Sequence, residues 1–326
     1  MRAVVTGGAG FVGSHLIESL VASGDEVVCV ERRGASLRWI RTLPVTVLTC
    51  GVHDPRALAP AFDGADVVFH LAGLTEARCP SDFYAVNTEG TAVVLQAAAQ
   101  FGDCAPHVIL TSSLAAVGPC RNGERLGPET VPYPLSHYGQ SKLRAEAVVH
   151  AHRDRVPATI VRLPSVYGPR ERGVLKFFQL VRHGVALTIG SWDREVSLIY
   201  VKDVVLGLRR IAGNSAAAGR TFHLAHPEVV TWRGFAAAVG AALGRAPILV
   251  SVPRAIAQIV ARCAETGAAL GRRAAILNRE RVREITQNRW VCDASRACTE
   301  LGFQPAYPTE RAVPETAHWY REAGWL

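Results

Sequence analysis

Short, continuous apolar runs alternate with longer segments of helical periodicity along the first half of the chain. The apolar runs cover residues 2–6, 26–30, 45–48, 66–71, 107–111 and 159–163. Runs of this length are typical of strands that are buried on both faces of a parallel sheet. Helical patterns lie between them, the clearest at residues 14–22 and 91–100. This alternation predicts an α/β fold built on a doubly wound parallel sheet with helices on both faces.

After about residue 167 the rhythm changes, because short apolar pieces alternate with glycine and proline. We expect the sheet domain to comprise residues 1–167 plus about 196–219, and a smaller, mixed substrate-binding region to comprise 168–195 and 220–326. Within that region, residues 253–275 form an alanine-rich, largely apolar helical stretch with arginines spaced along it. Such a stretch fits ordinary core, a dimer face or a cover over an apolar ligand.

The composition indicates a folded chain with a large core, since 49% of its 326 residues are hydrophobic and only 20% are charged. No apolar run reaches the ~18 residues that span a bilayer. The chain opens on a strand pattern without a signal peptide, so we expect a cytoplasmic protein. The eight cysteines are scattered without a C-x-x-C pair, which predicts reduced, structural thiols.

The formal net charge of +8 does not indicate a nucleic-acid partner, because the arginines are dispersed over the whole chain. A positive surface does attract phosphorylated cofactors and acidic ligands. His223 and His226 have a spacing that metal sites use, but no cysteine or carboxylate pattern accompanies them, so no metal site is predicted.

Three glycines directly after the first strand have the spacing of a phosphate-binding loop. Gly7, Gly10 and Gly13 let the backbone turn sharply and approach a pyrophosphate. The helix that follows offers free N–H groups at Phe11 and Val12. Because the pattern lies between a predicted strand and a predicted helix, it predicts a dinucleotide site of the Rossmann type.

The end of the second strand selects the dinucleotide. Glu31 lies about 18 residues after Gly13, where a carboxylate binds the ribose hydroxyls of NAD. Arg32 follows, and an arginine there can hold the 2′-phosphate of NADP, which Glu31 would repel. We therefore expect NAD, with NADP as the alternative. Asp54, after the third strand, fits either an acceptor for the adenine amino group or a helix N-cap.

A phenol and an amine four residues apart carry the candidate chemistry. Tyr138 and Lys142 lie on one face of a predicted helix, one turn apart. An ammonium beside a phenol favours the phenolate, which predicts a lowered tyrosine pKa and proton transfer near neutral pH. Ser112 and Ser113, at the end of the fifth strand, are candidates for a hydroxyl that holds the substrate oxygen beside the phenol.

Together these motifs resemble the extended short-chain dehydrogenase/reductase family, also called the NAD-dependent epimerase/dehydratase family. The matching segments cover essentially the whole chain and lie at residues 6–13, 70–73, 84–91, 138–142, 162–169, 200–204, 290–293 and 301–303. The resemblance is specific for the family and leaves the substrate open.

The resemblance also implies roles for individual residues. Tyr138 is implied as the general acid/base, Lys142 as the group that lowers its pKa and binds ribose, and Ser113, ahead of Ser112, as the holder of the substrate oxygen. Asn87 is implied as a support for the active-site backbone. The residues implied along the cofactor are Leu71, Ala72, Gly73 and Pro164.

Departures from the family pattern narrow the reaction. Sugar-nucleotide dehydratases of the family carry an Asp-Glu pair after the strand-end hydroxyl, where this chain has Leu114 and Ala115. Elimination needs a proton donor and a base near the sugar. Dehydration is therefore disfavoured.

The substrate side departs as well. Many sugar-nucleotide enzymes of the family carry asparagine at the position of Ser165 and arginine at that of Val196, although Arg194 and Arg283 lie nearby as substitutes. Ser165 after a proline, and the apolar stretch 253–275, are more similar to the 3β-hydroxysteroid dehydrogenase branch. There an apolar helical region covers a lipid-like substrate. The predicted substrate contacts are Leu74, Thr75, Ser165 and Arg283.

We therefore expect an NAD(P)-dependent oxidoreductase that acts at a secondary alcohol or ketone of a hydrophobic small molecule, with Tyr138 as its acid/base. A nucleotide-sugar 4-epimerase with tightly bound NAD is the first alternative. A non-catalytic NAD(P)-binding sensor is the second, although a sensor need not keep the Ser-Tyr-Lys set. The resemblance also implies a homodimer, formed through residues 91–100 and the helix that follows Tyr138.

Overall fold

A seven-stranded sheet forms the centre of the computed structural model, which describes residues 1–121, 123–270 and 278–326. Every neighbouring pair of its strands is parallel, in the order β10-β6-β5-β4-β1-β2-β3. The strands are β1 (Arg2–Thr6), β2 (Glu26–Glu31), β3 (Thr46–Thr49), β4 (Val67–His70), β5 (His107–Ser113), β6 (Ala158–Leu163) and β10 (Thr221–His223). The strand order reverses at β1, so the predicted α/β class with a doubly wound parallel sheet is confirmed.

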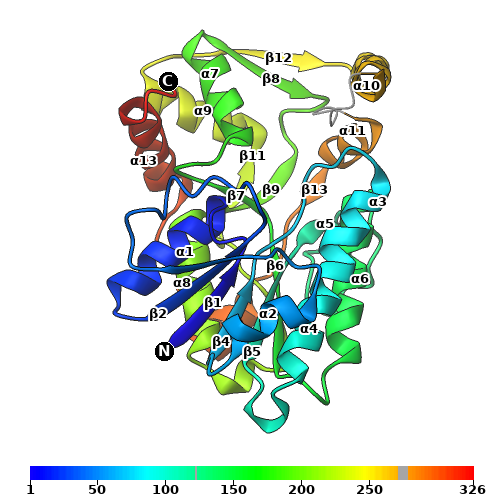
Figure 1. Ribbon diagram of the computed structural model, residues 1–326. Coiled ribbons are helices and arrows are strands. Elements are labelled where there is room, and N and C mark those ends of the chain that lie inside the picture. Colours follow the sequence, from blue (N-terminus) through cyan, green and yellow to red (C-terminus); the bar gives the residue numbers. More distant parts are fainter. Residues whose placement is uncertain (122, 271–277) are drawn as a thin grey trace.

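Helices cover both faces of this sheet (Figure 1). On one face lie α1 (Phe11–Ala22), α8 (Val201–Ala212) and α12 (Ser295–Leu301), and on the other α2 (Pro55–Phe62), α4 (Gly90–Ala99) and α6 (His137–Ala151). Alternation along each strand feeds both cores, since Val5 of β1 packs into the first and Val4 into the second. This two-sided burial is why the strands appear in the sequence as unbroken apolar runs.

Short helical pieces connect these elements. They are α3 (Pro80–Phe83), the π-helical turn η1 (Tyr84–Glu89), the 3-10 turns η2 (Gly102–Cys104) and η3 (Ser215–Ala217), and α5 (Leu114–Val117). The π-helical turn leads directly into α4, and such turns are frequent at functional sites.

The smaller region has its own strands and an aromatic core. In one sheet β9 (Glu195–Tyr200) pairs with β7 (Ser165–Tyr167), β11 (Val229–Thr231) and β13 (Arg289–Trp290), and a separate ribbon pairs β8 (Val185–Ile189) with β12 (Ile248–Val252). The remaining helices are α7 (Gly173–Arg182), α9 (Trp232–Leu243), α10 (Arg254–Leu270), α11 (Arg279–Ile285) and α13 (Thr309–Glu322). Phe178, Phe235 and Tyr320 pack edge to face in the core between α7, α9 and α13.

Strand β9 belongs to both cores, because Ile199 packs with the large sheet and Leu198 with the aromatic core. The division at residues 167, 195 and 219 therefore stays a proposal. β10 lies beyond the last of these boundaries, yet it pairs with β6 in the large sheet.

The predicted apolar helix at 253–275 is present as α10, and residues 271–275 lie outside the described part of the chain. Among the residues that the structure describes, no helix has the length and apolar character needed to cross a membrane.

Candidate active site

The loop between β1 and α1 forms a cradle that depends on glycine. A Cβ on Gly7 would lie 2.8 Å from the backbone nitrogen of Ala72, and one on Gly13 would lie 2.3 Å from the carbonyl oxygen of Gly7. Gly7 also adopts a φ of +70°, which favours glycine. The loop therefore packs directly on the end of β4 and on the first turn of α1.

The start of α1 is open to an anion. Among the described residues, no side chain caps this helix at Gly10. The first N–H groups, including those of Phe11 and Val12, have no acceptor within the helix. Such N–H groups at the positive end of a helix dipole bind pyrophosphate. The cradle and the open helix start together fit a dinucleotide.

The end of β2 lies beside this cradle. The Oε1 atom of Glu31 accepts a hydrogen bond from the backbone N–H of Ala9 at 2.7 Å, which ties the strand end to the loop. Arg32, the next residue, is exposed. Asp54 accepts from the backbone N–H of Arg56 at 2.9 Å and is the N-cap of α2. The structure thus contains the capping contact, and an adenine contact by Asp54 stays a prediction.

Asn87 holds the backbone that follows β4. Its Oδ1 atom accepts from the N–H of Leu74 at 2.8 Å, and its Nδ2 donates to the carbonyl of Leu74 at 3.0 Å and to Ser141 Oγ at 2.9 Å. A Cβ on Gly73 would lie 3.0 Å from Asn87 Oδ1 and 3.1 Å from Lys142 Nζ. Glycine at 73 therefore lets the amide and the amine approach the end of β4, as the support implied for Asn87 requires.

A buried histidine links Asn87 back to β1. His70 contacts Thr6 Oγ1 through Nδ1 at 2.8 Å and Thr91 Oγ1 through Nε2 at 3.1 Å, and Thr91 Oγ1 donates to the carbonyl of Asn87 at 2.7 Å. Burial lowers the pKa of His70 to about 3, so the ring is neutral at neutral pH. Because the Thr91 proton is committed to Asn87, this network assigns the His70 proton to Nε2.

The two serines at the end of β5 have different partners. Ser112 is buried and donates to Glu146 Oε1 at 2.5 Å, and Glu146 also forms an ion pair with Arg162 at 2.8 Å. Ser113 is a hydrogen-bond partner of the Tyr138 phenol, and it accepts from the backbone N–H of Ala115 at 3.1 Å. The structure thus places Ser113, and not Ser112, beside Tyr138.

Tyr138 lies in the first turn of α6, where that helix begins against α5. Ser136 caps the helix by accepting from the backbone N–H of Gly139 at 3.0 Å. A Cβ on Gly139 would lie 2.3 Å from the carbonyl oxygen of Ala115. Glycine at 139 is therefore what lets the start of α6 approach the end of β5.

The sequence predicted a lowered pKa for Tyr138, and this prediction is wrong for the structure without cofactor. Burial raises the pKa of Tyr138, the hydrogen bond with Ser113 lowers it in part, and the carboxylate of Glu284 raises it further. Lys142 does not offset this rise, because its Nζ donates to the carbonyl of Thr111 at 2.9 Å. Burial also lowers the pKa of Lys142 to about 8, with Glu146 acting in the opposite direction.

Helix α11 contributes residues that the sequence alone did not single out. Glu284 accepts from Ser136 Oγ at 2.5 Å, and Glu280 accepts from the backbone N–H of His137 at 2.9 Å. Two glutamates four residues apart lie on one helix face, which was a visible signal. Nothing in the sequence indicated that this face meets the start of α6. Carboxylates at that position stabilise the positive end of the α6 dipole.

The predicted substrate residues are less tightly placed. Pro164 is buried, Leu74 is half-buried, and Thr75, Ser165 and Arg283 are exposed. Arg194 is only 5% exposed and is held inside the β8–β9 connection. Its Nε donates to the carbonyl of Ser191 at 2.7 Å and its Nη2 to Thr188 Oγ1 at 2.5 Å.

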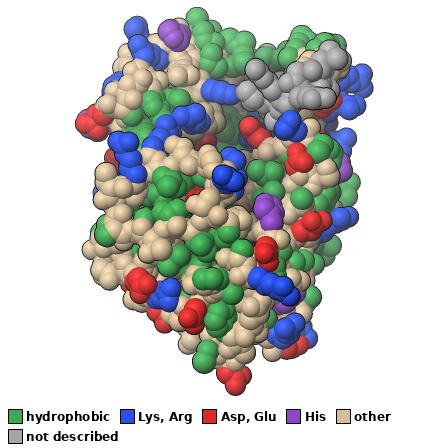
Figure 2. Space-filling view, in the orientation of Figure 1, with side chains coloured by type: hydrophobic (Ala, Val, Ile, Leu, Met, Phe, Trp, Pro, Cys, Tyr) green, Lys and Arg blue, Asp and Glu red, His purple; other side chains and the backbone are tan. Residues whose placement is uncertain are grey.

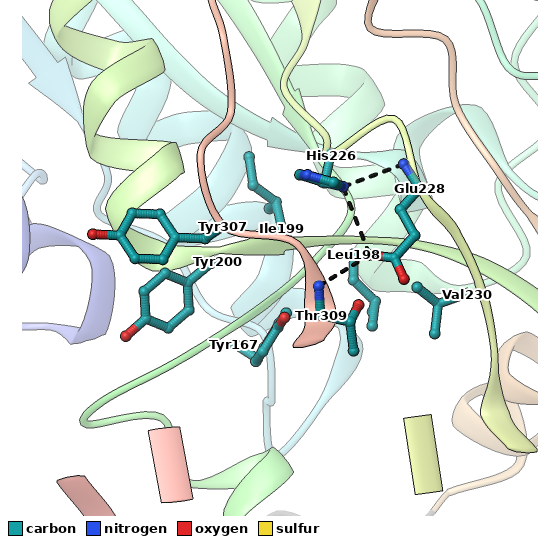
Figure 3. A pocket seen from close by; sticks show the side chains of 9 residues that line it. All are labelled: Tyr167, Leu198, Ile199, Tyr200, His226, Glu228, Val230, Tyr307 and Thr309. Atoms are coloured by element: carbon teal, nitrogen blue, oxygen red, sulfur yellow. Dashed lines mark hydrogen bonds and ion pairs between the residues drawn. The ribbon is translucent and has the colours of Figure 1, made fainter. Parts of the chain in front are cut away.

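Figure 3 shows a second polar spot, in the smaller region, which contains none of the predicted site residues. Glu228 lies at its centre, accepts from the backbone N–H of Thr309 at 3.0 Å and approaches His226 at 3.8 Å. Tyr200 and Tyr307 stack beside it, 4.8 Å apart. The space between the side chains does not admit a water molecule. We therefore interpret this spot as a fastening of α13 and not as a ligand site.

The glycine cradle, Glu31, the β4 end, Ser113, Tyr138 and Lys142 thus lie along the carboxyl edge of the large sheet. The model of the NAD-dependent epimerase/dehydratase family matches residues 3–225 of the chain. The chain belongs to this family. The predicted family is confirmed, and the members named below are enzymes.

Two curated members of the NAD-dependent epimerase/dehydratase family show the range of similarity. The ceramide reductase of Caulobacter vibrioides is 29% identical over 322 residues, which cover 99% of this chain and 95% of that protein. The decarboxylating sterol-4-alpha-carboxylate 3-dehydrogenase of Dictyostelium discoideum is 27% identical over 242 residues, 71% of this chain and 73% of that protein.

A solved member confirms the fold. The UDP-glucose 4-epimerase of Thermus thermophilus, in complex with NAD, superimposes with a TM-score of 0.80 at 22% identity. The match covers 99% of this chain and 100% of that one.

Proposed function

We propose that this protein is an NAD-dependent dehydrogenase or reductase that interconverts a secondary alcohol and a ketone in a hydrophobic substrate. The observation that carries the proposal is the apolar continuation of β5 beyond Ser113. Leu114 is 4% exposed and packs with Val117, Leu126 and Cys292, where an eliminating enzyme needs acids. The similarity to a ceramide reductase over nearly the whole chain supports a lipid-like substrate.

In this proposal Ser113 and Tyr138 both hydrogen-bond the substrate oxygen. Tyr138 gives its phenolic proton to that oxygen during reduction and takes it back during oxidation. Lys142 moves from the Thr111 carbonyl toward the ribose, where its positive charge favours the phenolate. The apolar surroundings of Leu114 exclude water from the reacting carbon and leave the proton on a single oxygen.

The cofactor is held by residues of the large sheet's carboxyl edge. Residues 7–13 receive the pyrophosphate, Glu31 the adenosine ribose, and residues 71–73 with Pro164 flank the nicotinamide side. When bound, nicotinamide supplies or accepts a hydride. We propose NAD in preference to NADP because the Glu31 carboxylate would repel a 2′-phosphate.

Cofactor analysis separates this function from its alternatives. The purified protein is denatured and assayed for released NAD, and the native protein is titrated with NADH and NADPH by fluorescence. We expect tighter binding of NADH, and absorbance change of the nicotinamide with a keto lipid or a sterol ketone. Stoichiometric carried-over NAD together with turnover of a UDP-sugar without added cofactor would establish the epimerase instead. NADH binding without turnover of either substrate class would leave the sensor.

Removing one hydroxyl tests the acid/base. We expect Tyr138→Phe to lower kcat by roughly 10²- to 10⁴-fold, the usual contribution of a positioned acid/base, with NADH affinity unchanged. Tyr133→Phe is the matched control, because that phenol is 56% exposed and lies outside the site. A Tyr138→Phe protein with full activity would remove the proposed mechanism.

A further inference from the structure

Large aliphatic side chains are exposed together on one edge of the smaller region. Six of the ten exposed large hydrophobic residues among those described lie on β8, β12 and α10. We call this set the apolar edge; its members are Leu187, Ile248, Val250, Ile256, Ile259 and Val260. Their exposed fractions run from 38% at Val250 to 70% at Ile248. In Figure 2 hydrophobic side chains gather along the upper border, where Figure 1 shows β12.

Helix α10 has a second apolar stripe besides the one it buries. Ala257 and Ala261 are buried and pack against Val282 of α11. Ile256, Ile259, Val260 and Cys263 follow the i, i+3, i+4, i+7 spacing of a single helix face and are all exposed. Burying the alanine stripe therefore leaves an isoleucine and valine stripe with no protein to cover it.

The β8–β12 ribbon continues this stripe. Val250 pairs with Leu187 in the parallel ribbon, so both side chains and that of Ile248 point to one face. Further along the same face, Ile189 and Val252 pack against Ala257 and Ala261 of α10. Helix and ribbon thus share one side of the molecule, and the apolar edge is continuous.

The charges beside the apolar edge are nearly all positive. Arg254 and Arg262 are exposed on α10, and Arg245 is exposed just before β12. Between residues 245 and 270 the only acidic residue is Glu265, which pairs with Arg279 at 2.8 Å. Exposed aliphatic side chains with flanking arginines match a surface of apolar chains under anionic head groups.

We propose that the apolar edge docks this protein on the surface of an anionic lipid bilayer. A second copy of the chain fits less well, because a two-fold contact would bring Arg254 and Arg262 toward their own counterparts. The docking is peripheral, since the helix lies on the molecule and inserts only one row of side chains.

The apolar edge is one helix away from the candidate active site. Helix α10 packs on α11 through Val282, and α11 bonds Ser136 and His137 through Glu284 and Glu280. His137 directly precedes Tyr138. A docked molecule would hold its substrate side near the lipid, so a membrane-resident substrate would reach Tyr138 without crossing water. The choice of a bilayer rests on the proposed function, whereas the docking itself is measured without turnover.

Vesicle flotation tests the docking. The full-length protein is mixed with phosphatidylcholine vesicles, with or without phosphatidylglycerol, in the absence of cofactor and substrate. We expect it to float with the anionic vesicles and to be released by salt. Ile256→Ser with Ile259→Ser should weaken the partition roughly tenfold or more. Arg254→Gln with Arg262→Gln should weaken it by roughly tenfold and remove the preference for phosphatidylglycerol.

Val131→Ser is the matched control, because Val131 is 79% exposed but lies away from the apolar edge. It should float like the parent protein, and all variants should keep the parent melting temperature. Flotation that is absent, or unchanged in the isoleucine variant, overturns the proposal. So does a parent dimer, measured by light scattering, that the same isoleucine variant converts to monomer without any vesicle binding.

Turnover of a short, water-soluble ketone separates the two proposals. If that ketone and the lipid ketones are not turned over while flotation persists, the function fails and the docking stands. Turnover without flotation removes the docking alone.

Discussion

The frame of the large sheet and the edge formed by α10 treat their side chains in opposite ways. Around the sheet, charged groups are buried and fully paired, as Arg162 and Glu146 are at 7% and 2% exposure. Along α10, isoleucines remain exposed while alanines are buried. The first arrangement fixes reacting groups in position, and the second leaves an unsatisfied surface. The difference indicates that the sheet side serves chemistry and the α10 side serves contact with something outside the protein.

The largest expected effect comes from breaking the buried ion pair. Arg162→Met leaves Glu146 buried with only Ser112 as a partner. Removing one member of a buried pair typically costs about 3–5 kcal/mol, so we expect a loss of that size in the free energy of unfolding measured with urea. Arg220→Met is the control, since Arg220 pairs with Glu300 at 51% and 34% exposure and should cost less than about 1 kcal/mol. Equal losses would contradict the contrast between the two regions.

A smaller effect, of opposite sign, is expected at Lys142. Its pKa in the folded protein is about 8, below the value of ~10.4 for a free lysine. Folding therefore disfavours the charged amine, and this cost is full below pH 8 and fades as pH rises toward ~10.4. We expect Lys142→Met to stabilise the cofactor-free protein by about 1–2 kcal/mol at pH 7 and to lose this advantage by about pH 10.

Denaturation curves at several pH values check the Lys142 prediction. Lys176→Met, at an exposed position, should change stability little at any pH. A Lys142→Met protein that is destabilised at pH 7 would show that the Thr111 hydrogen bond outweighs burial of the charge.

The smallest effect concerns Glu284, which carries the influence of α11 into the site. Its carboxylate raises the pKa of Tyr138. Glu284→Gln should therefore lower that pKa, and the rise of kcat/KM with pH in the oxidation direction should move to lower pH by less than about one unit. Glu280→Gln is the control, because Glu280 bonds the backbone of His137 and does not act on the phenol. A shift in both variants, or in neither, would assign the effect to helix geometry.

The sheet side was predictable because its signals are local. Unbroken apolar runs, the glycine spacing and the Tyr138–Lys142 spacing each depend on a few neighbouring residues, and the strands and the loop lie where they were expected. The pKa of Tyr138 was not predictable, because it depends on burial and on where Lys142 Nζ points. The contact of Glu284 and Glu280 with α6 joins residues more than 140 positions apart. Likewise, the sequence indicated an apolar helix after residue 253, but only packing decides which of its stripes stays exposed.

Strand β10 gives the order of the chain a consequence for biosynthesis. It completes the large sheet at β6, yet it follows β7, β8 and β9 of the smaller region. On the ribosome, β6 therefore waits for roughly 60 further residues before its neighbour emerges, which is a few seconds at ordinary elongation rates. During that time its unpaired edge is a template for wrong pairing. A nascent chain that stalls at the end of β6 would present this edge to other chains, and a gene cut at residue 167 would make that state permanent.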